Sequence, residues 1–396
     1  MSANTWVGRS MAKGLWVIIL LLAACTSSVR TPLNSLPDPS ELDSHFAAIM
    51  GEHQVATVGA ALIRDGKIAW TGYYGEQTPG VPTSRETLFN TGSIAKTVTA
   101  EVIMRLAEQG VLSLDEPMFP HWVDPDLVDD PRHKLLTPRL ALTHRTGFPN
   151  WRYMDPEFKL RFIRAPGTAF GYSGEGLEYV AKFAEAKTGK SFDSLVGELV
   201  SRPLGVKSMA VAPQTWVIDR IVHPVNAVGK RSRPFCTGPD ERRCTSVGEW
   251  SAADDLATSI ESYAKFMIAI MNGQGVGGEL HTDRLRVQSS TAQDEILACA
   301  LADTSLCPVA QGYGLGWEIF DFGETKIASH GGSDWSERAM AYFDVETRDG
   351  IILFLNVPSS TSVEALIDGM NALDPGSKIA MLYRGWVDAY NEKQKR

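Results

Sequence analysis

Ser93 and Lys96 are the two residues of this sequence whose types and spacing first suggest chemistry. Lys96 lies in an almost unbroken apolar run from Ile94 to Leu106, and no carboxylate occurs within four residues of it on either side. Residues three positions apart on a helix share a face, so the two side chains would meet. Burial disfavours the charged form of an amine, and an uncharged lysine can take the proton of a serine hydroxyl. The pair therefore predicts a serine nucleophile activated by a lysine base.

The spacing of this pair is weak evidence by itself, because other parts of the chain carry similar patterns. A serine three residues before a lysine also occurs at 10/13 and at 262/265, the latter on a predicted helix with ordinary packing. The Lys-Thr-Gly sequence at 187–189 falls where a helix is expected to end at a glycine cap. The glycines of 273–278 follow a helix rather than a strand, which excludes a dinucleotide site. The surrounding sequence must therefore identify the site.

The elements around this pair can be predicted from turns and periodicity. A helix is expected to begin with Ser40 as its N-cap. Two β-prone runs within 55–75 flank the turn at 64–67, which predicts a hairpin. The helix that carries Lys96 is expected to end at Gly110. Ser93 would then stand where strand and loop give way to helix, so that backbone N–H groups and the positive end of the helix dipole could stabilise an oxyanion.

The rest of the chain predicts the fold class. Helices and Pro-rich loops are expected over roughly 115–235, β-prone runs dominate 313–357, and a last helix is expected near 377–394. Strands at both ends with helices between them predict an α+β fold. In that fold, the N- and C-terminal segments build one antiparallel sheet flanked by helices, with a mostly helical region inserted. We expect a single catalytic domain over residues 40–394.

A set of short segments carries a resemblance to a known family. In chain order they are LFNTGSIAKTVTA, LSLDEP, LALTHRTGFPNW, PGTAFGYSGEGLEYV, RPLGVKSM and ASHGGSDW. In this order and rough spacing they resemble the serine hydrolases of the class C β-lactamase and penicillin-binding-protein type, including D,D-peptidase, D-aminopeptidase and esterase relatives. The resemblance covers roughly residues 40–385. It implies a β-lactamase/transpeptidase-like fold with the active site in the groove between the sheet and the helical region.

The resemblance also implies roles for three catalytic residues. Ser93 would be the acylated nucleophile and Lys96 its base or proton relay. Tyr172 would be the second member of the proton network, either as a phenolate beside a cation or as a phenol that donates to the leaving group. A buried tyrosine with only a structural role is the alternative for Tyr172.

The third motif of the family corresponds to His330, Gly331 and Gly332 on a strand that lines the groove. Small residues there would let the substrate backbone approach. The N–H groups of Ser93 and Ser333 would then form the oxyanion hole. A histidine beside glycines in an ordinary loop is the alternative interpretation.

Two positions depart from the family's pattern. Gly174 stands where the second motif often has an asparagine that holds an amide substrate, and His330 stands where the third motif often has a lysine. Histidine is mostly neutral at pH 7, whereas lysine offers a fixed charge to a substrate carboxylate. Both departures favour ester or small-peptide hydrolysis over efficient β-lactam turnover. Trp151 and Trp335 follow motif segments and could wall an acyl pocket or pack in the core.

These observations predict an exported serine hydrolase that is acylated on Ser93, acts on a small ester or peptide, and needs no metal or organic cofactor. One alternative is a D,D-carboxypeptidase or β-lactamase that acts on cell-wall-like amides. Another is a catalytically inactive, penicillin-binding-protein-like envelope protein. The net charge of −9 and the lack of a basic cluster disfavour nucleic acid as a partner.

The N-terminus predicts export. In residues 1–24, Arg9 and Lys13 precede an apolar core that is too short to span a bilayer permanently, which indicates a signal peptide. The sequence LAAC that ends at Cys25 resembles the bacterial lipobox, so Cys25 is expected to be lipidated. A plain signal peptide with a chance cysteine is the alternative.

Residues 25–39 are expected to form a flexible tether between the lipid and the domain. The predicted location is the bacterial cell envelope, facing the periplasm, with the membrane as a partner through the lipid. Thr26 favours the outer membrane by analogy with the family. Either Met1 or Met11 could be the true start.

The remaining cysteines, Cys236, Cys244, Cys299 and Cys307, could form two local disulfides, 236–244 and 299–307, in an oxidising compartment. Other pairings stay open from the sequence. Neither pair has the spacing of metal ligands, which disfavours zinc.

Overall fold

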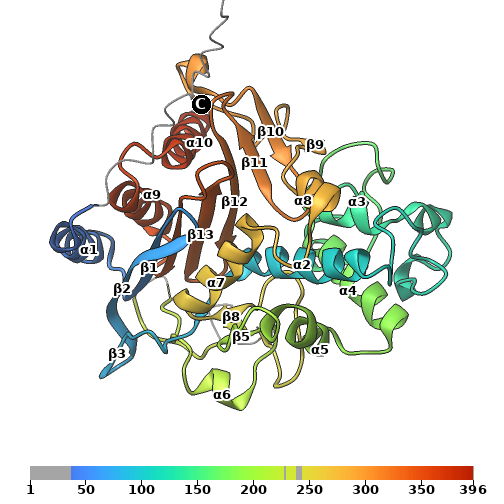
Figure 1. Cartoon of the computed structure of the whole chain (residues 1–396), viewed down its shortest axis with the longest axis horizontal. Coiled ribbons are helices and arrows are strands. Elements are labelled where there is room, and N and C mark those ends of the chain that lie inside the picture. The colour runs from blue at the N-terminus through green and yellow to red at the C-terminus, as the bar shows by residue number, and fades with distance from the viewer. Residues whose placement is uncertain (1–36, 227–228, 238–242, 396) are drawn as a thin grey trace, which may run out of the picture. The chain divides into compact units, whose positions relative to one another are not determined.

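A nine-stranded antiparallel sheet stands at the centre of the structure, and both ends of the chain contribute to it (Figure 1). The structure, a computed structural model, describes residues 37–226, 229–237 and 243–395, all of which belong to one compact unit. In sheet order the strands are β3 (Val81–Pro82), β2 (Lys67–Thr78), β1 (Thr57–Arg64), β14 (Gly350–Asn356), β13 (Glu337–Asp344), β12 (Lys326–Ser333), β11 (Glu318–Asp321), β10 (Ala310–Tyr313) and β9 (Ser289–Ser290).

The pairing of β1 with β14 confirms the predicted α+β fold with one sheet built from both ends of the chain. Thr57 lies opposite Asn356, and the register continues to the pair Ile63 and Gly350. The predicted hairpin also forms, since β1 and β2 pair around a two-residue turn. Asp65 and Gly66 both have positive φ angles, 46° and 67°, as a type I′ turn requires.

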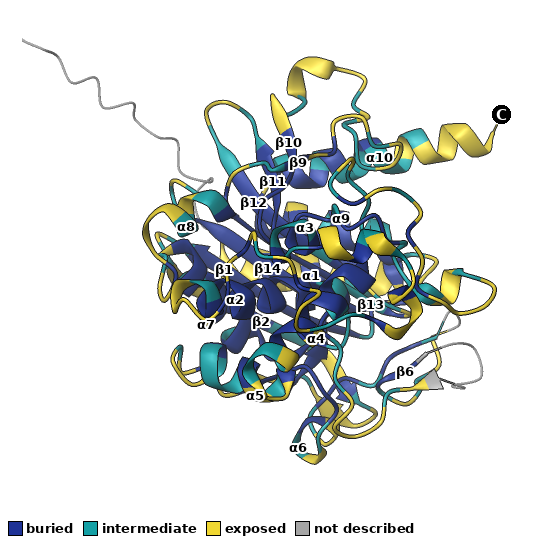
Figure 2. Cartoon of the chain, turned by 90° about the vertical axis from the view of Figure 1, so that its right-hand side faces the viewer, coloured by how far each residue is buried: buried dark blue, intermediate teal, exposed yellow. Residues whose placement is uncertain are grey.

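Helices cover both faces of this sheet (Figures 1 and 2). Alternate residues of β13 belong to two separate apolar cores, because successive side chains of a strand point to opposite faces. One face packs against α1 (Pro39–His53), α9 (Ser362–Leu373) and α10 (Lys378–Gln394). The core on the other face includes α2 (Ala95–Glu108), α4 (Gly174–Thr188) and α7 (Ile260–Met271). No helix in the described part of the chain is both long enough and apolar enough to cross a membrane.

Shorter elements complete the fold. The remaining helices are α3 (Pro138–Leu142), α5 (Phe192–Val196), α6 (Thr215–Ile218) and α8 (Gly278–Arg284). The remaining strands are β4 (Phe89–Asn90), β5 (Met209–Ala210), β6 (Cys236–Thr237), β7 (Arg243–Cys244) and β8 (Ala257–Thr258). Short 3-10 helices are η1 (Gly92–Ile94), η2 (Pro125–Leu127), η3 (Pro131–Leu135), η4 (Arg152–Met154) and η6 (Thr304–Leu306), and η5 (Gly197–Ser201) is a π-helix.

The predicted start of the first helix is wrong by two residues. Asp38, not Ser40, is the N-cap of α1, and its side chain accepts a hydrogen bond from the backbone N–H of Ser40 at 2.8 Å. Pro39 then occupies the first helical position, where its missing N–H costs nothing and its fixed φ suits the helix. Ser40 therefore lies inside the first turn.

The other sequence patterns set aside above lie in ordinary structure. Lys187-Thr188-Gly189 ends α4, with Gly189 as a left-handed cap. Ser262 and Lys265 lie in α7, and the glycines of 273–278 follow that helix in turns. The pattern at 10/13 lies outside the described residues.

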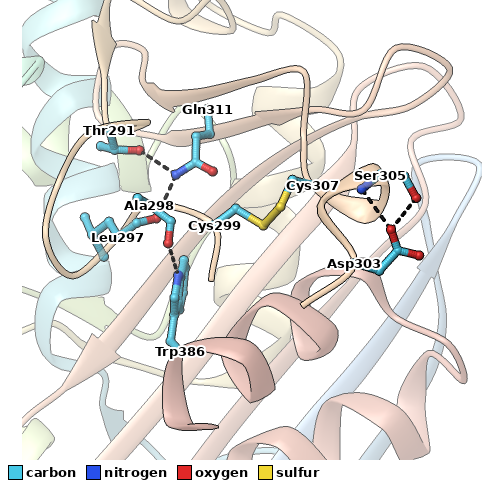
Figure 3. The surroundings of a disulfide bond; sticks show 9 residues. All are labelled: Thr291, Leu297, Ala298, Cys299, Asp303, Ser305, Cys307, Gln311 and Trp386. Carbon is cyan, nitrogen blue, oxygen red and sulfur yellow. Dashed lines mark hydrogen bonds between the residues drawn. A yellow bond between two sulfur atoms is a disulfide. The ribbon is translucent and has the colours of Figure 1, made fainter. Parts of the chain in front are cut away.

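Two disulfides link the cysteines in the described part of the chain, Cys236 with Cys244 and Cys299 with Cys307. These are the two local loops that the sequence predicts. The second disulfide lies beside the loop that precedes β10, where Trp386 of α10 donates to the carbonyl oxygen of Ala298 at 2.8 Å (Figure 3).

A buried ionic cluster holds α2 in place. The Glu101 carboxylate accepts from Arg105 Nε at 2.6 Å and from Arg284 Nη2 at 2.7 Å. All three side chains are buried, and the single carboxylate is shared between two guanidinium groups. Glu101 is committed to these arginines, and Lys96, five residues earlier, has no carboxylate partner on its own helix.

Candidate active site

Lys96 and Ser93 meet at the start of α2. Ser93 lies in η1, which runs directly into the helix, and Lys96 lies in the first helical turn. Lys96 is only 1% exposed, and its Nζ lies 2.9 Å from Ser93 Oγ and 2.7 Å from the carbonyl oxygen of Ala253. The structure therefore brings the two residues together, and within the described residues the hydrogen-bond partners of the amine are one hydroxyl and one carbonyl.

Aromatic rings surround the amine of Lys96. Its Nζ lies 5.0 Å from the ring centroid of Tyr172 and 5.6 Å from that of Trp151, within the range of cation–π contacts. The Tyr172 ring packs against the imidazole of His144, with centroids 4.4 Å apart. Within the described residues, no hydrogen bond joins the Tyr172 hydroxyl to Ser93 or Lys96. The ring stands at the site, and its part in proton transfer stays a prediction.

Gly174 and Trp151 fit each other. A Cβ atom built on Gly174 would lie 2.6 Å from Trp151 Cη2, so any larger residue there would collide with the indole. Asn150, which precedes the tryptophan, accepts a hydrogen bond from the Gly174 N–H at 2.9 Å. Trp151 therefore occupies the space toward which a side chain at 174 would point. Trp335, the other candidate wall residue, is 39% exposed and does not line the cavity described below.

The end of β12 packs directly on the turn that carries Ser93. A Cβ atom on Gly332 would lie 2.0 Å from the carbonyl oxygen of Thr91, and a Cβ atom on Gly92 would lie 3.0 Å from the backbone nitrogen of Ser333. Glycine is therefore required at 332 for this close approach. The packing puts Ser333 beside the nucleophile's turn, as an oxyanion hole made of the Ser93 and Ser333 N–H groups would need. That hole itself remains a prediction.

The two histidines of the site are neutral. Burial, with the charge of Lys96 as a second cause, lowers the pKa of His330 to about 3. Its Nδ1 lies 2.7 Å from the Gly331 carbonyl oxygen, so Nδ1 carries the proton. Burial also lowers the pKa of His144 well below its usual range, and its Nδ1 accepts from the Ser173 N–H at 3.1 Å. Neither imidazole supplies a fixed positive charge to the site.

Glu178 is a residue of the site that the sequence reasoning missed. Its Oε1 accepts three hydrogen bonds, from Ser251 Oγ at 2.7 Å and from the N–H groups of Ala252 and Ala253 at 2.9 and 3.2 Å. These bonds fix the loop that contains Ala253, whose carbonyl oxygen accepts a hydrogen bond from the Lys96 amine. The available signal was spacing, since Glu178 follows Gly174 by one turn of α4 and shares its face.

A cavity of about 620 Å³ opens beside these residues. Most of the predicted site residues line it, namely Ser93, Tyr172, His330, Gly331, Gly332 and Ser333. Leu297 and Trp386 line it as well, and hydrogen bonds fix both residues or their neighbours (Figure 3). Gln311 Nε2 donates to the Leu297 carbonyl oxygen at 2.7 Å and to Thr291 Oγ1 at 3.1 Å.

Glu318 brings a carboxylic acid to the same cavity. It is buried at the start of β11, and its Oε1 has no hydrogen-bond partner among the described residues. Burial raises the pKa of Glu318 to about 8, so the group is neutral at pH 7. In the part of the chain that the structure describes, no cluster of three His, Cys, Asp or Glu side chains could hold a metal ion.

Comparison with known proteins agrees with this geometry. Residues 42–372 match the family described as Beta-lactamase. The chain belongs to the beta-lactamase family. Because that family consists of serine hydrolases, this chain is a β-lactamase-related serine hydrolase, as the motif resemblance implies.

Individual relatives are distant. "Penicillin-binding protein 4" of Amycolatopsis lactamdurans is 23% identical over 80% of this chain and 84% of its own length. "Esterase EstB" of Burkholderia gladioli is 26% identical over 47% of this chain, and the match spans about half (55%) of the esterase. The octameric penicillin-binding protein homologue of Pyrococcus abyssi has a similar fold, with a TM-score of 0.66 at 20% identity over 85% of this chain and 79% of its own.

The Glu178 clamp predicts a specific loss of activity. We expect Glu178→Ala to lower kcat for an activated aryl ester about 10- to 100-fold with a small change in KM, because the carbonyl that holds Lys96 loses its anchor. Glu178→Gln keeps an oxygen acceptor in the same place and should retain most of the activity. Steady-state kinetics of the wild type and the two variants test this. A kcat of Glu178→Ala equal to that of the wild type would show that Glu178 does not contribute to the site.

Glu318 predicts a pH dependence of stability. Its pKa is about 8 in the folded protein and about 4.3 in an unfolded chain. Between these values the folded state holds the extra proton, so the free energy of unfolding falls as pH rises, by about 1.4 kcal/mol per pH unit. Glu318→Gln removes this slope and should gain stability over the wild type from pH 5 to pH 8. Urea unfolding at several pH values measures the free energy of unfolding, with Glu324→Gln, a substitution at an exposed position, as control. If this free energy changes with pH in the same way in the wild type and in Glu318→Gln, the pKa of Glu318 is not raised.

Proposed function

We propose that this serine hydrolase cleaves small esters or short peptides through an acyl-enzyme on Ser93, in preference to efficient β-lactam hydrolysis. The observation that carries the proposal is the contact of the buried Lys96 amine with the Ser93 hydroxyl at 2.9 Å, with no carboxylate paired to the amine among the described residues. The amine lies within hydrogen-bond distance of the hydroxyl whose proton it would take, as a general base must.

The chemistry follows from these contacts. A neutral Lys96 amine keeps one N–H on the Ala253 carbonyl oxygen while its lone pair takes the proton of Ser93 Oγ. Oγ then bonds to the substrate carbonyl carbon, and the carbonyl electrons move to the oxygen. The N–H groups of Ser93 and Ser333 stabilise that charge.

The acyl-enzyme forms when the bond to the leaving group breaks and the leaving group takes a proton from Lys96, either directly or through Tyr172. Water then attacks the acyl carbon and gives its proton to the same groups. When the second tetrahedral intermediate collapses, the bond between Oγ and the acyl carbon breaks, Oγ takes back a proton from Lys96, and the acid is released.

Three features support esters or short peptides over β-lactams. Gly174 offers no side-chain amide to a substrate, and Trp151 fills the space in front of it. His330 is neutral and gives no fixed charge to a substrate carboxylate. The esterase and penicillin-binding-protein relatives are compatible with this range of substrates.

Intact-mass spectrometry and turnover assays test this proposal. The wild type should turn over an aryl ester such as 4-nitrophenyl acetate. Ser93→Ala should lose this turnover and the label from a fluorophosphonate. We expect Lys96→Ala to fold but not to acylate, because the base is gone. An acylation rate in Lys96→Ala equal to that of the wild type would refute the role of the lysine.

Penicillin provides the contrasting substrate in the same assay. A slow or absent reaction with penicillin agrees with the proposal. A long-lived penicillin adduct or fast penicillin hydrolysis would favour the carboxypeptidase or β-lactamase alternative instead. Failure of the ester, of penicillin and of the fluorophosphonate to label Ser93 would indicate an inactive envelope protein.

We also propose that the protein is exported and anchored by a lipid on Cys25, after removal of residues 1–24. These residues lie outside the described part of the chain, and the support comes from the sequence and from the two disulfides, which suit an oxidising compartment. In a bacterial host fed labelled palmitate, the wild type should carry the label in the membrane fraction. Cys25→Ser should lose the label, and a labelled Cys25→Ser protein would contradict the proposal.

A further inference from the structure

Glu318 is a buried carboxyl group at the catalytic cavity that has no partner in the chain. It lies at the start of β11, directly opposite Ser329 of β12 and Tyr313 of β10. The residue is 5% exposed. Across residues 37–226, 229–237 and 243–395, its carboxyl group takes part in no hydrogen bond and no ion pair, and its Oε1 is fully buried. A buried polar atom without a partner is costly, so this one calls for an explanation in function.

The surroundings keep this carboxyl group protonated at neutral pH. Burial without a compensating cation disfavours the charged form, and it raises the pKa of Glu318 to about 8. A protonated carboxyl group can donate one hydrogen bond, whereas a carboxylate can only accept. Ser329 Oγ, on the neighbouring strand, is also buried and also has no partner among the described residues. Glu318 therefore brings an unused, neutral hydrogen-bond donor to the cavity.

Two phenols border the same space. Tyr313 and Tyr383 both line the cavity, and the Tyr383 hydroxyl lies 2.8 Å from where a Cβ atom on Gly331 would stand. Burial raises the pKa of both tyrosines, and the charge of an ionised Glu318 is the second cause in each, which indicates that the three groups are close together. Within the part of the chain that the structure describes, neither phenol hydroxyl makes a hydrogen bond. Each is a neutral group that can both donate and accept.

The other charged or titratable groups at the cavity are neutral or already bonded. The Asp294 carboxylate accepts from two N–H groups of its own loop, at 3.0 Å each. The guanidinium of Arg164 donates to a backbone carbonyl oxygen, and that of Arg338 donates to two serine hydroxyls. His330 is neutral for the reason given above, and Tyr172 stands beside the catalytic amine. The groups that remain for a ligand around Glu318 are thus the neutral ones.

We propose that Glu318, Tyr313 and Tyr383 form a subsite for an uncharged oxygen of the substrate, such as that of an alcohol or an ether. The protonated carboxyl group would donate to this oxygen, and the phenols would donate to it or accept from its hydroxyl hydrogen. A carboxylate would find no counter-charge in these three groups, and an ammonium group would require Glu318 in its ionised form. The preferred substrates are therefore esters that carry a second, uncharged oxygen. This inference rests on the proposed acyl-enzyme at Ser93.

Two matched pairs of esters test the inference. On the leaving group, 3-(hydroxymethyl)phenyl acetate is compared with 3-ethylphenyl acetate. On the acyl group, 4-nitrophenyl 3-methoxypropanoate is compared with 4-nitrophenyl pentanoate. Each kcat/KM is divided by the rate constant of the same ester with hydroxide, which corrects for intrinsic reactivity. At pH 7 the wild type should favour the oxygen-bearing member of at least one pair by about threefold to tenfold, because that member leaves no buried donor unpaired.

The pH dependence of this preference identifies the donor. The ratio of the two kcat/KM values within a pair cancels ionisations that affect both substrates alike, such as that of Lys96. Because the pKa of Glu318 is about 8 in the folded protein, the ratio should be constant from pH 6 to pH 7 and should fall toward pH 9.5, where the carboxylate cannot donate. Glu318→Gln keeps a donor that does not titrate, so its preference should persist over the whole range.

Two further variants separate the donor from the shape of the cavity. Glu318→Leu removes the donor, so kcat/KM for the oxygen-bearing ester should fall to the value of its partner. Asp294→Asn is the matched control, because this residue lines the same cavity and the amide keeps the oxygen that accepts from its own loop. It should keep both the preference and its pH dependence. Thermal unfolding confirms that each variant folds, and if Glu318→Leu does not fold, the pH dependence of the wild type decides.

Several results would overturn the inference. They are equal corrected kcat/KM values within both pairs for the wild type, a wild-type preference in Glu318→Leu, and a wild-type preference that stays constant up to pH 9.5. A higher kcat/KM for 3-(aminomethyl)phenyl acetate than for the hydroxymethyl ester would overturn it as well, because Glu318 would then bind a cation in its ionised form. If the wild type hydrolyses no ester and a fluorophosphonate does not label Ser93, the proposed function itself is wrong.

Discussion

The position of one buried amine determines what this site can do. Lys96 is held between the hydroxyl of Ser93 and the carbonyl of Ala253, with aromatic rings around it and no counter-ion among the described residues. A free amine in water would stay charged and far from a particular hydroxyl. The first turn of α2 fixes its approach to Ser93, and the packing of that helix in the core removes the water. The carbonyl of Ala253 is the third requirement, because it holds the amine in one place.

Helix α4 links the parts of the site that α2 does not carry. Tyr172 stands just before the helix, Gly174 begins it under the indole of Trp151, and Glu178 clamps the loop of Ala253 from the next turn. One short segment thus positions the phenol, shapes the wall of the site and supports the lysine. A shift of α4 would disturb all three features together, which explains why its N-terminus is fixed by Ser173 as cap and by hydrogen bonds to Asn150.

The sequence correctly predicted the structural features that depend on residues close together in the chain. The hairpin at Asp65 and Gly66, the helix after Ser93 and the glycine cap at 189 all follow from local turn chemistry and periodicity, and the sheet built from both ends followed from the order of elements. Ser40 was wrongly predicted as the N-cap because both Asp38 and Ser40 are residue types that cap helices. Pro39 favours the first helical position, which makes Asp38 the cap. The contacts of Lys96 with Ala253 and of Glu178 with the same loop could not be predicted from the sequence. They join segments that no local pattern connects, and both use backbone atoms.

The two departures from the family's motifs have different structural consequences. At 174 the change is enforced by a neighbour, because the indole of Trp151 leaves no room for the asparagine that relatives often carry there. Restoring that amide would require a change at 151 as well. At 330 the neutral imidazole leaves β12 without a fixed charge for a substrate carboxylate. The first change is therefore fixed by the packing of a neighbouring indole, whereas the second removes a charge without a change of packing being needed to explain it, and the proposed preference for esters or short peptides over β-lactams rests on both.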